Sequence, residues 1–187
     1  MKNVIKLGLM VLMLSVSSVD AEAQKYFTRN GMISFFSSTP VEDIKAINSS
    51  VSCVLDSESG ALEFAALMKA FKFKKALMEE HFNENYVESA TYPKGTFKGQ
   101  ITNLDEIDFS KDGTYPAKVK GEMNIHGVSK EVESEGSIEV KDGKVSILSE
   151  FLLSPEDYDI EIPGVVRDKI AEELEINVSA ELAPFNR

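Results

Sequence analysis

Cysteine and histidine are scarce in this chain of 187 residues. The single cysteine, Cys53, excludes a disulfide within the chain, so packing and sheet hydrogen bonds must supply its stability. Cys53 lies in a strand-like run, where a buried small hydrophobic residue is a better interpretation than a reactive thiol. Neither His81 nor His126 has a neighbouring His or Cys, so we expect no metal site. A helix surface suits His81, and a structural hydrogen bond at a turn is the simpler hypothesis for His126.

Motifs for catalysis and phosphate binding are also missing from the sequence. It contains no Gly-x-Ser-x-Gly turn and no Gly-rich phosphate loop. Carboxylate pairs such as Glu79-Glu80 and Glu172-Glu173 occur, but in an acidic chain they are typical of a solvated face. We therefore expect no catalytic residues and no cofactor. The alternative, an enzyme of unknown class, would need an acid, a base and a nucleophile to converge.

Positive charge is in deficit. The chain has 20 Lys and Arg against 31 Asp and Glu, which gives a net charge of −11. This charge repels phosphate backbones and argues against nucleic-acid binding. No cluster of basic residues on an amphipathic helix suggests adsorption to a membrane surface either.

Long apolar runs are limited to the N-terminus. The run 4–19 follows Lys2, includes Lys6, and is followed by Ala21-Glu22-Ala23, which is typical of a signal peptide cleaved before Gln24. A membrane anchor is the alternative, but the run is shorter than the roughly 20 residues that span a bilayer. We expect a signal peptide at residues 1–23, one domain at residues 24–187, no membrane anchor after cleavage, and a periplasmic or secreted protein. The oligomeric state, including a homodimer, stays open.

Alternating apolar and polar residues dominate the predicted mature chain. Val119, Gly121, Met123 and Ile125 share one face, and apolar residues resume after His126-Gly127, so we expect a hairpin there. A second hairpin is predicted at Asn30-Gly31. Strand-like runs lie at 24–30, 32–37, 44–55, 61–69, 96–107, 115–125, 128–140, 144–153 and 174–182.

Helical patterns are confined to residues 74–84, where apolar residues have helical spacing, and to a second short segment, 165–173. The sequence therefore predicts an all-β antiparallel barrel or sandwich of about eight strands, with one or two short inserted helices. The first helix would cap one end of a barrel.

The hairpin sequence resembles a family signature. Residues 121–132 read Gly-Glu-Met-Asn-Ile-His-Gly-Val-Ser-Lys-Glu-Val, which resembles the central hairpin of the YceI-like, lipocalin-like family of secreted polyisoprenoid-binding proteins. Tyr92-Pro93 followed by Phe97 resembles a second segment of that family. The family's Gly-x-Phe strand near the N-terminus and its Asn-Arg-x-x-Phe-Gly-like segment near the C-terminus are not found. The resemblance implies an eight-stranded antiparallel lipocalin-like barrel that carries a polyisoprenoid or similar long-chain lipid in the bacterial envelope.

Candidate ligand-binding residues are apolar, inward-facing and near the helix-capped end. The alternative for each is a place in an ordinary core, and a filled barrel would instead serve as a structural or protein-interaction module. Met and Phe suit a cavity for a flexible chain because both adapt to irregular shapes. The candidates are Phe64, Ala66, Met68, Phe71, Phe73, Leu77, Met78, Phe82, Val119, Met123, Ile125, Ile147 and Phe151.

Overall fold

The computed structural model describes residues 24–185, so the predicted signal peptide lies outside the described residues. The strands are β1 (Lys25–Ser38), β2 (Asp43–Asp56), β3 (Ala61–Leu67), β4 (Lys72–Phe73), β5 (Lys94–Ile101), β6 (Gly113–Ile125), β7 (Val128–Lys141), β8 (Lys144–Leu153) and β9 (Leu174–Pro184). The helix α1 (Ala76–His81) continues into a π-helical turn, η2 (Phe82–Tyr86). Short 3-10 turns are η1 (Met68–Ala70), η3 (Leu104–Glu106), η4 (Pro155–Tyr158) and η5 (Gly164–Val166).

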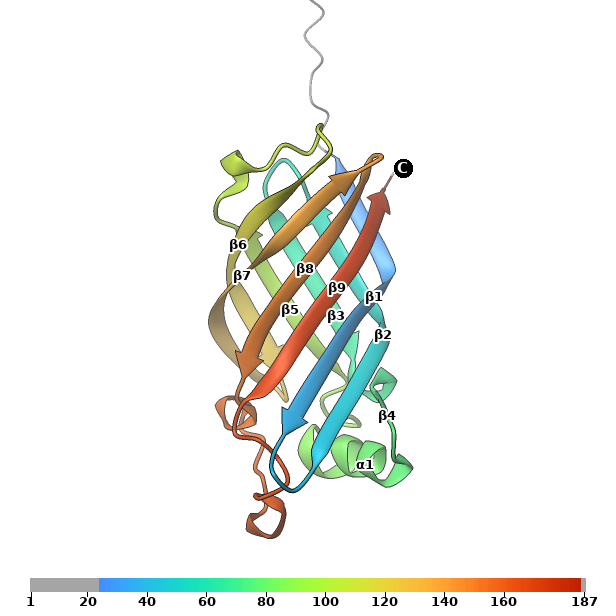
Figure 1. Ribbon diagram of the computed structural model, residues 1–187, viewed down its shortest axis with the longest axis vertical. Coiled ribbons are helices and arrows are strands. Elements are labelled where there is room, and N and C mark those ends of the chain that lie inside the picture. Colours follow the sequence, from blue (N-terminus) through green and yellow to red (C-terminus); the bar gives the residue numbers. More distant parts are fainter. Residues whose placement is uncertain (1–23, 186–187) are drawn as a thin grey trace, which may run out of the picture.

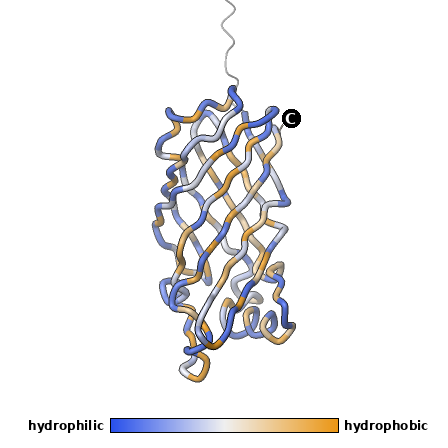
Figure 2. Tube along the Cα trace, viewed as in Figure 1, coloured by the Kyte–Doolittle hydropathy of each residue, from blue (hydrophilic) through white to orange (hydrophobic). Residues whose placement is uncertain are grey.

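Eight of these strands form a closed antiparallel barrel, as the sequence predicts. Their order is β1-β9-β8-β7-β6-β5-β3-β2, and β1 also pairs with β2, which closes the ring (Figure 1). The two-residue strand β4 adds to β2 beyond the end of β3. Apolar and polar residues alternate along the strands (Figure 2), so one set of side chains points into the barrel and the other into solvent.

The two ends of the barrel differ. The helix end, at the bottom of Figure 1, carries α1 and the loop between β8 and β9. The closed end carries the turns at 57–60, 102–112 and 142–143. The interior of the closed end is filled by a cluster that includes Leu55, Ile138 and Leu182, each at most 1% exposed. A second cluster, with Phe71 and Tyr158, lies at the helix end.

The hairpin at His126-Gly127 is confirmed. Ile125 pairs with Val128, and the two turn residues have φ angles of 53° and 78°. The left-handed region suits Gly127, and a side chain there would also collide with the ring of Tyr92. The turn at Asp142-Gly143 is confirmed as well, with φ angles of 50° and 75°.

The predicted hairpin at Asn30-Gly31 is wrong. β1 runs unbroken through this pair, with register shifts against β2 on both sides of Gly31. A Cβ atom at Gly31 would lie 3.0 Å from the carbonyl oxygen of Val51, so glycine permits a close approach of strands at a bulge instead of a chain reversal. The reversal occurs at Thr39, whose hydroxyl accepts the backbone N–H groups of Val41 and Glu42.

Two further predictions need correction. The helix predicted over 165–173 is only the 3-10 turn η5 followed by turns, because Val165 is 87% exposed and no buried apolar stripe stabilises a helix there. The strand predicted over 96–107 ends at Ile101, and η3 follows. The first helix, predicted over 74–84, is confirmed as α1 with η2. The observed segment starts and ends two residues later than predicted.

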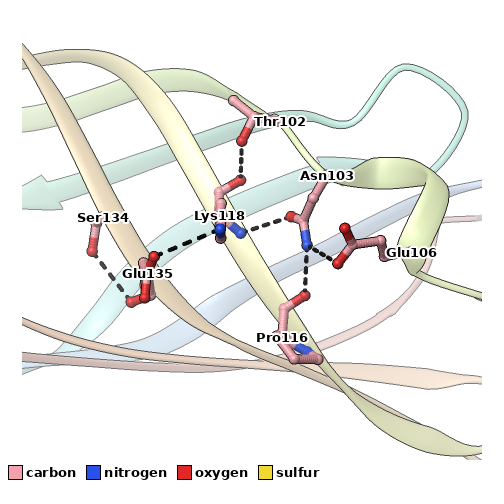
Figure 3. Close-up of polar contacts among 7 residues, drawn as sticks. All are labelled: Thr102, Asn103, Glu106, Pro116, Lys118, Ser134 and Glu135. Atoms are coloured by element: carbon pink, nitrogen blue, oxygen red, sulfur yellow. Dashed lines mark hydrogen bonds and ion pairs between the residues drawn. The ribbon is translucent and has the colours of Figure 1, made fainter.

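The side chain of Asn103 explains why β5 ends at Ile101. Its buried amide accepts the Lys118 N–H at 2.8 Å and donates to the Pro116 carbonyl at 3.1 Å and to Glu106 at 3.0 Å (Figure 3). The side chain thus takes the place of a neighbouring strand for two backbone groups of β6. The amide of Asn103 therefore holds the turn against the barrel wall.

Substituting Asn103→Ala should lower the free energy of unfolding by about 2 to 3 kcal/mol, because two backbone groups lose their partner in a buried place. Urea denaturation measures this change. The matched control is Asn124→Ala, which removes an exposed hydrogen bond to Ser129 and should cost less than about 1 kcal/mol. Equal losses in the two variants would contradict the anchoring role of Asn103.

Candidate ligand cavity

A cavity of about 780 Å³ occupies the helix-end half of the barrel. Its size lies within the roughly 300 to 1,000 Å³ of sites for small ligands. Its wall is mainly apolar, and its floor is the packed core of the closed end, where Leu62 and Ile138 meet it. The barrel is therefore filled in one half and hollow in the other.

All thirteen residues predicted as ligand-facing lie on the wall of this cavity. β3 contributes Phe64 and Ala66, and β6 contributes Val119, Met123 and Ile125 as inward-facing neighbours. Leu77, on α1, is 60% exposed and lies at the rim. The structure brings the thirteen residues together, and their binding of a ligand stays a prediction.

Four phenylalanines cover part of the helix end. Phe35, Phe71, Phe73 and Phe82 form a cluster with ring centroids 5.1 to 5.8 Å apart. They come from β1, the loop before β4, β4 and the π-helical turn, so the inserted helical segment reaches the barrel wall through aromatic contacts. Such edge-on and tilted pairs stabilise the cover without polar atoms that would face an apolar cavity.

Sequence reasoning found only Ile147 and Phe151 of β8 on the opposite wall and missed the rest of it. Inward-facing residues of β1, β7 and β9, and the loop between β8 and β9, complete the cavity. Alternation in 33–37 and 174–178 could have identified the residues on β1 and β9, whereas the loop residues have no periodic pattern. The missed residues include Ile33, Phe35, Val132, Ile160, Ile162, Ile176 and Val178.

A carboxylate ties the helix to the barrel. Glu79 on α1 accepts the Lys72 ammonium at 2.5 Å and the Phe73 backbone N–H at 3.3 Å. The hydrogen bond from Lys72, with the Phe73 N–H and the charge of Lys72, lowers the pKa of Glu79 below its ordinary 4.5. The position of α1 over the cavity thus depends on an ionised carboxylate.

His126 joins three segments at the same end. Its Nδ1 atom lies 3.2 Å from the Tyr158 carbonyl oxygen, and its Nε2 atom lies 3.3 Å from a carboxylate oxygen of Glu88. The Tyr92 ring meets the imidazole edge-on, with centroids 4.6 Å apart. The predicted hydrogen bond at the turn is therefore present, and His81 is exposed on α1 as expected.

The remaining residues considered for reactivity or metal binding do not form a polar site in the described part of the chain. Cys53 is fully buried, and burial raises the pKa of its thiol, so the reading as a small core residue is confirmed. Within residues 24–185, no group of three His, Cys, Asp or Glu side chains is placed to hold a metal ion. None of the helices in this part of the chain is long and apolar enough to cross a membrane.

The closed eight-stranded barrel with an apolar cavity at one end defines the class as lipocalin-like. The model of the YceI-like domain matches residues 15–182, so this chain belongs to the YceI-like family, as its central hairpin suggests. No curated protein sequence matches the chain.

Solved structures share the fold. A polyisoprenoid-binding domain from Saccharophagus degradans, implicated in plant cell wall breakdown, aligns with a TM-score of 0.76 at 11% identity, over 88% of this chain and 100% of that one. Burkholderia cenocepacia BcnA aligns with a TM-score of 0.66 at 13% identity, over 82% and 96%. The YCEI protein of Campylobacter jejuni aligns with a TM-score of 0.56 at 16% identity, over 100% of both chains.

We expect acid to loosen the helix before the barrel unfolds. Because the folded-state pKa of Glu79 is lowered, its stabilisation is complete above the ordinary carboxyl pKa and is lost as pH falls through the lowered value. The protection factor of the Phe73 amide, measured by hydrogen exchange, should fall below pH 4.5.

The Glu79→Ala variant should show a low protection factor for the Phe73 amide both above and below pH 4.5. The control is Glu80→Ala, which changes an exposed neighbour on the same helix and should behave as the unsubstituted protein. If Glu79→Ala kept the acid-dependent change, the pH dependence would belong to another group.

Proposed function

We propose that this protein is a non-enzymatic carrier that holds a polyisoprenoid or similar long-chain lipid inside its barrel in the bacterial envelope. The observation that carries the proposal is the apolar cavity of about 780 Å³ within a closed barrel. The name of the Saccharophagus degradans domain, a polyisoprenoid-binding domain of the same fold, supports this ligand class.

The physical argument rests on transfer out of water. A flexible apolar chain gains roughly 25 cal/mol for each Å² of surface that it removes from water. The cavity offers Phe and Met side chains, which adapt to a branched chain, and few polar groups that would need hydrogen bonds from the ligand. Shape and apolar area, rather than specific polar contacts, would therefore dominate binding.

A filled interaction module is less well supported, because packing at native density would leave no cavity of this size. Family membership and the related folds also favour binding over catalysis. The location in the envelope rests on the signal-peptide pattern at residues 1–23.

The first experiment is native mass spectrometry of mature protein purified from a periplasm without detergent, followed by organic extraction. We expect a stoichiometric adduct that is released as an isoprenoid lipid. A clean apo mass, with no uptake of added isoprenoids, would contradict the proposal.

Substituting Met123→Asp should reduce the affinity for an isoprenoid at least about 100-fold, because an apolar chain would have to pack against a buried charge. The matched control is Asn124→Asp, which places the same carboxylate on the next residue of β6, whose side chain lies on the outer face. Fluorescence titration with retinol measures both affinities, and circular dichroism verifies folding. Equal affinities would place the ligand outside the cavity.

A further inference from the structure

The barrel wall has one incomplete seam, between β7 and β8. β7 pairs with β6 from Val128 to Val140, and β8 pairs with β9 from Val145 to Leu153. The ladder between β7 and β8, in contrast, stops at Gly136 and Ser149. Toward the helix end the two strands separate (Figure 1). We call this gap, between 130–135 of β7 and 150–153 of β8, the side slot.

Polar contacts frame the side slot at both ends. At its upper end the hydroxyl groups of Ser134 and Ser149 lie 3.0 Å apart, and Ser149 also donates to the Glu135 carbonyl at 2.9 Å. At its lower end the Lys130 ammonium meets the carboxylate of Asp157, on the turn after β8, at 2.6 Å. These contacts hold the two strands at a defined separation without a backbone ladder.

The cavity extends through this slot. Four other strands, β1, β3, β6 and β9, contribute only inward-facing residues to the cavity wall. β7 and β8 contribute outward-facing residues as well, including Glu131, Glu133 and Leu152. On β7 every residue from Lys130 to Ile138 borders the cavity, whereas β5 contributes a single outward-facing residue, Thr96, so the space reaches the gap between β7 and β8. The interior is therefore continuous with solvent at the side slot.

The outer edge of the side slot carries apolar side chains that suit an apolar ligand chain. Leu148 and Leu152 point outward from β8 and are 49% and 59% exposed. The closed end is filled by core residues, and the phenylalanine cluster covers part of the helix end, where the exposed Lys75, Leu77 and His81 also border the cavity. Four carboxylates lie outside the slot, Glu131, Glu133, Glu135 and Glu150, against two lysines paired with them, Lys118 and Lys120. The local charge therefore stays negative, which disfavours a phosphorylated end and favours a neutral one.

We propose that the side slot between β7 and β8 is the portal through which a long apolar chain with an uncharged polar end enters and leaves the cavity. This proposal rests on the proposed function. The chain slides sideways between the strand edges past Leu152 into the hollow half, and the barrel ladder elsewhere stays intact. Uptake then requires no opening of the helix end.

The test closes the slot with a covalent bridge. Glu133→Cys and Leu152→Cys place two outward thiols on the facing edges, and a short bis-maleimide joins them. Cys53 is fully buried and does not compete for the reagent. The control joins Glu133→Cys to Lys120→Cys, a pair that already lies side by side in the β6–β7 ladder. Retinol, a neutral isoprenoid alcohol, is the probe, and stopped-flow fluorescence measures its uptake rate.

We expect the bridge across the slot to slow retinol uptake at least about tenfold, and the control bridge to leave it unchanged, because only the first blocks the passage. Unchanged uptake across the bridged slot would overturn the portal while leaving the proposed function intact. No retinol binding by either unbridged protein would overturn the proposed function and the portal with it. Bridges between chains in dilute protein would overturn the portal in favour of a second copy paired on these edges.

A second pair of variants covers the case in which the double variants fold poorly. Leu152→Cys alone, coupled to a polyethylene glycol maleimide, places a bulky group over the slot. Asn177→Cys carries the same adduct on the outer face of β9, where the ladders on both sides are complete. The adduct at residue 152 should slow uptake and the adduct at residue 177 should not. Equal rates would overturn the portal.

Discussion

The closure of the hydrogen-bond ladder is the constraint on which the rest of this structure depends. β1 pairs with both β2 and β9, so the first strand of the sheet also joins its last. Closure satisfies backbone groups that an open sheet would leave exposed at its edges, and it creates an interior that only alternate side chains reach. The bulge at Gly31 lets β1 serve both neighbours, which explains why a sequence typical of a turn lies inside a strand.

Once the ring is closed, the sizes of the inward side chains decide how much of it is filled. Leu55, Ile138 and Leu182 meet at the closed end and exclude solvent. At the helix end the interior side chains line a space of about 780 Å³, and the phenylalanine cluster covers part of it. The packed half supplies the stability of a chain without disulfides, and this leaves the other half free to stay hollow.

The polar groups that matter are few and placed where the sheet is interrupted. Asn103 replaces a strand neighbour at the end of β5, and His126 joins the central hairpin to two other segments. Ser134 and Ser149 mark the point where β7 and β8 separate. Asn103 and Ser149 give backbone groups of neighbouring strands a hydrogen-bond partner where the ladder stops, and His126 links the hairpin turn to segments outside the sheet.

The sequence by itself determined most of the strands, the central hairpin, the capping helix and part of the apolar cavity wall, because period-two alternation and turn residues are local signals. It could not determine that Asn30-Gly31 is a bulge, since that depends on the approach of Val51, twenty residues away. Residues 165–173 have a helical pattern, yet no surface packs against them. Only the tertiary structure decided that the barrel is hollow at one end, because the cavity depends on the volumes of inward side chains from strands distant in the chain. It alone also decided that β7 and β8 separate, because that depends on how far each strand pairs with its neighbours.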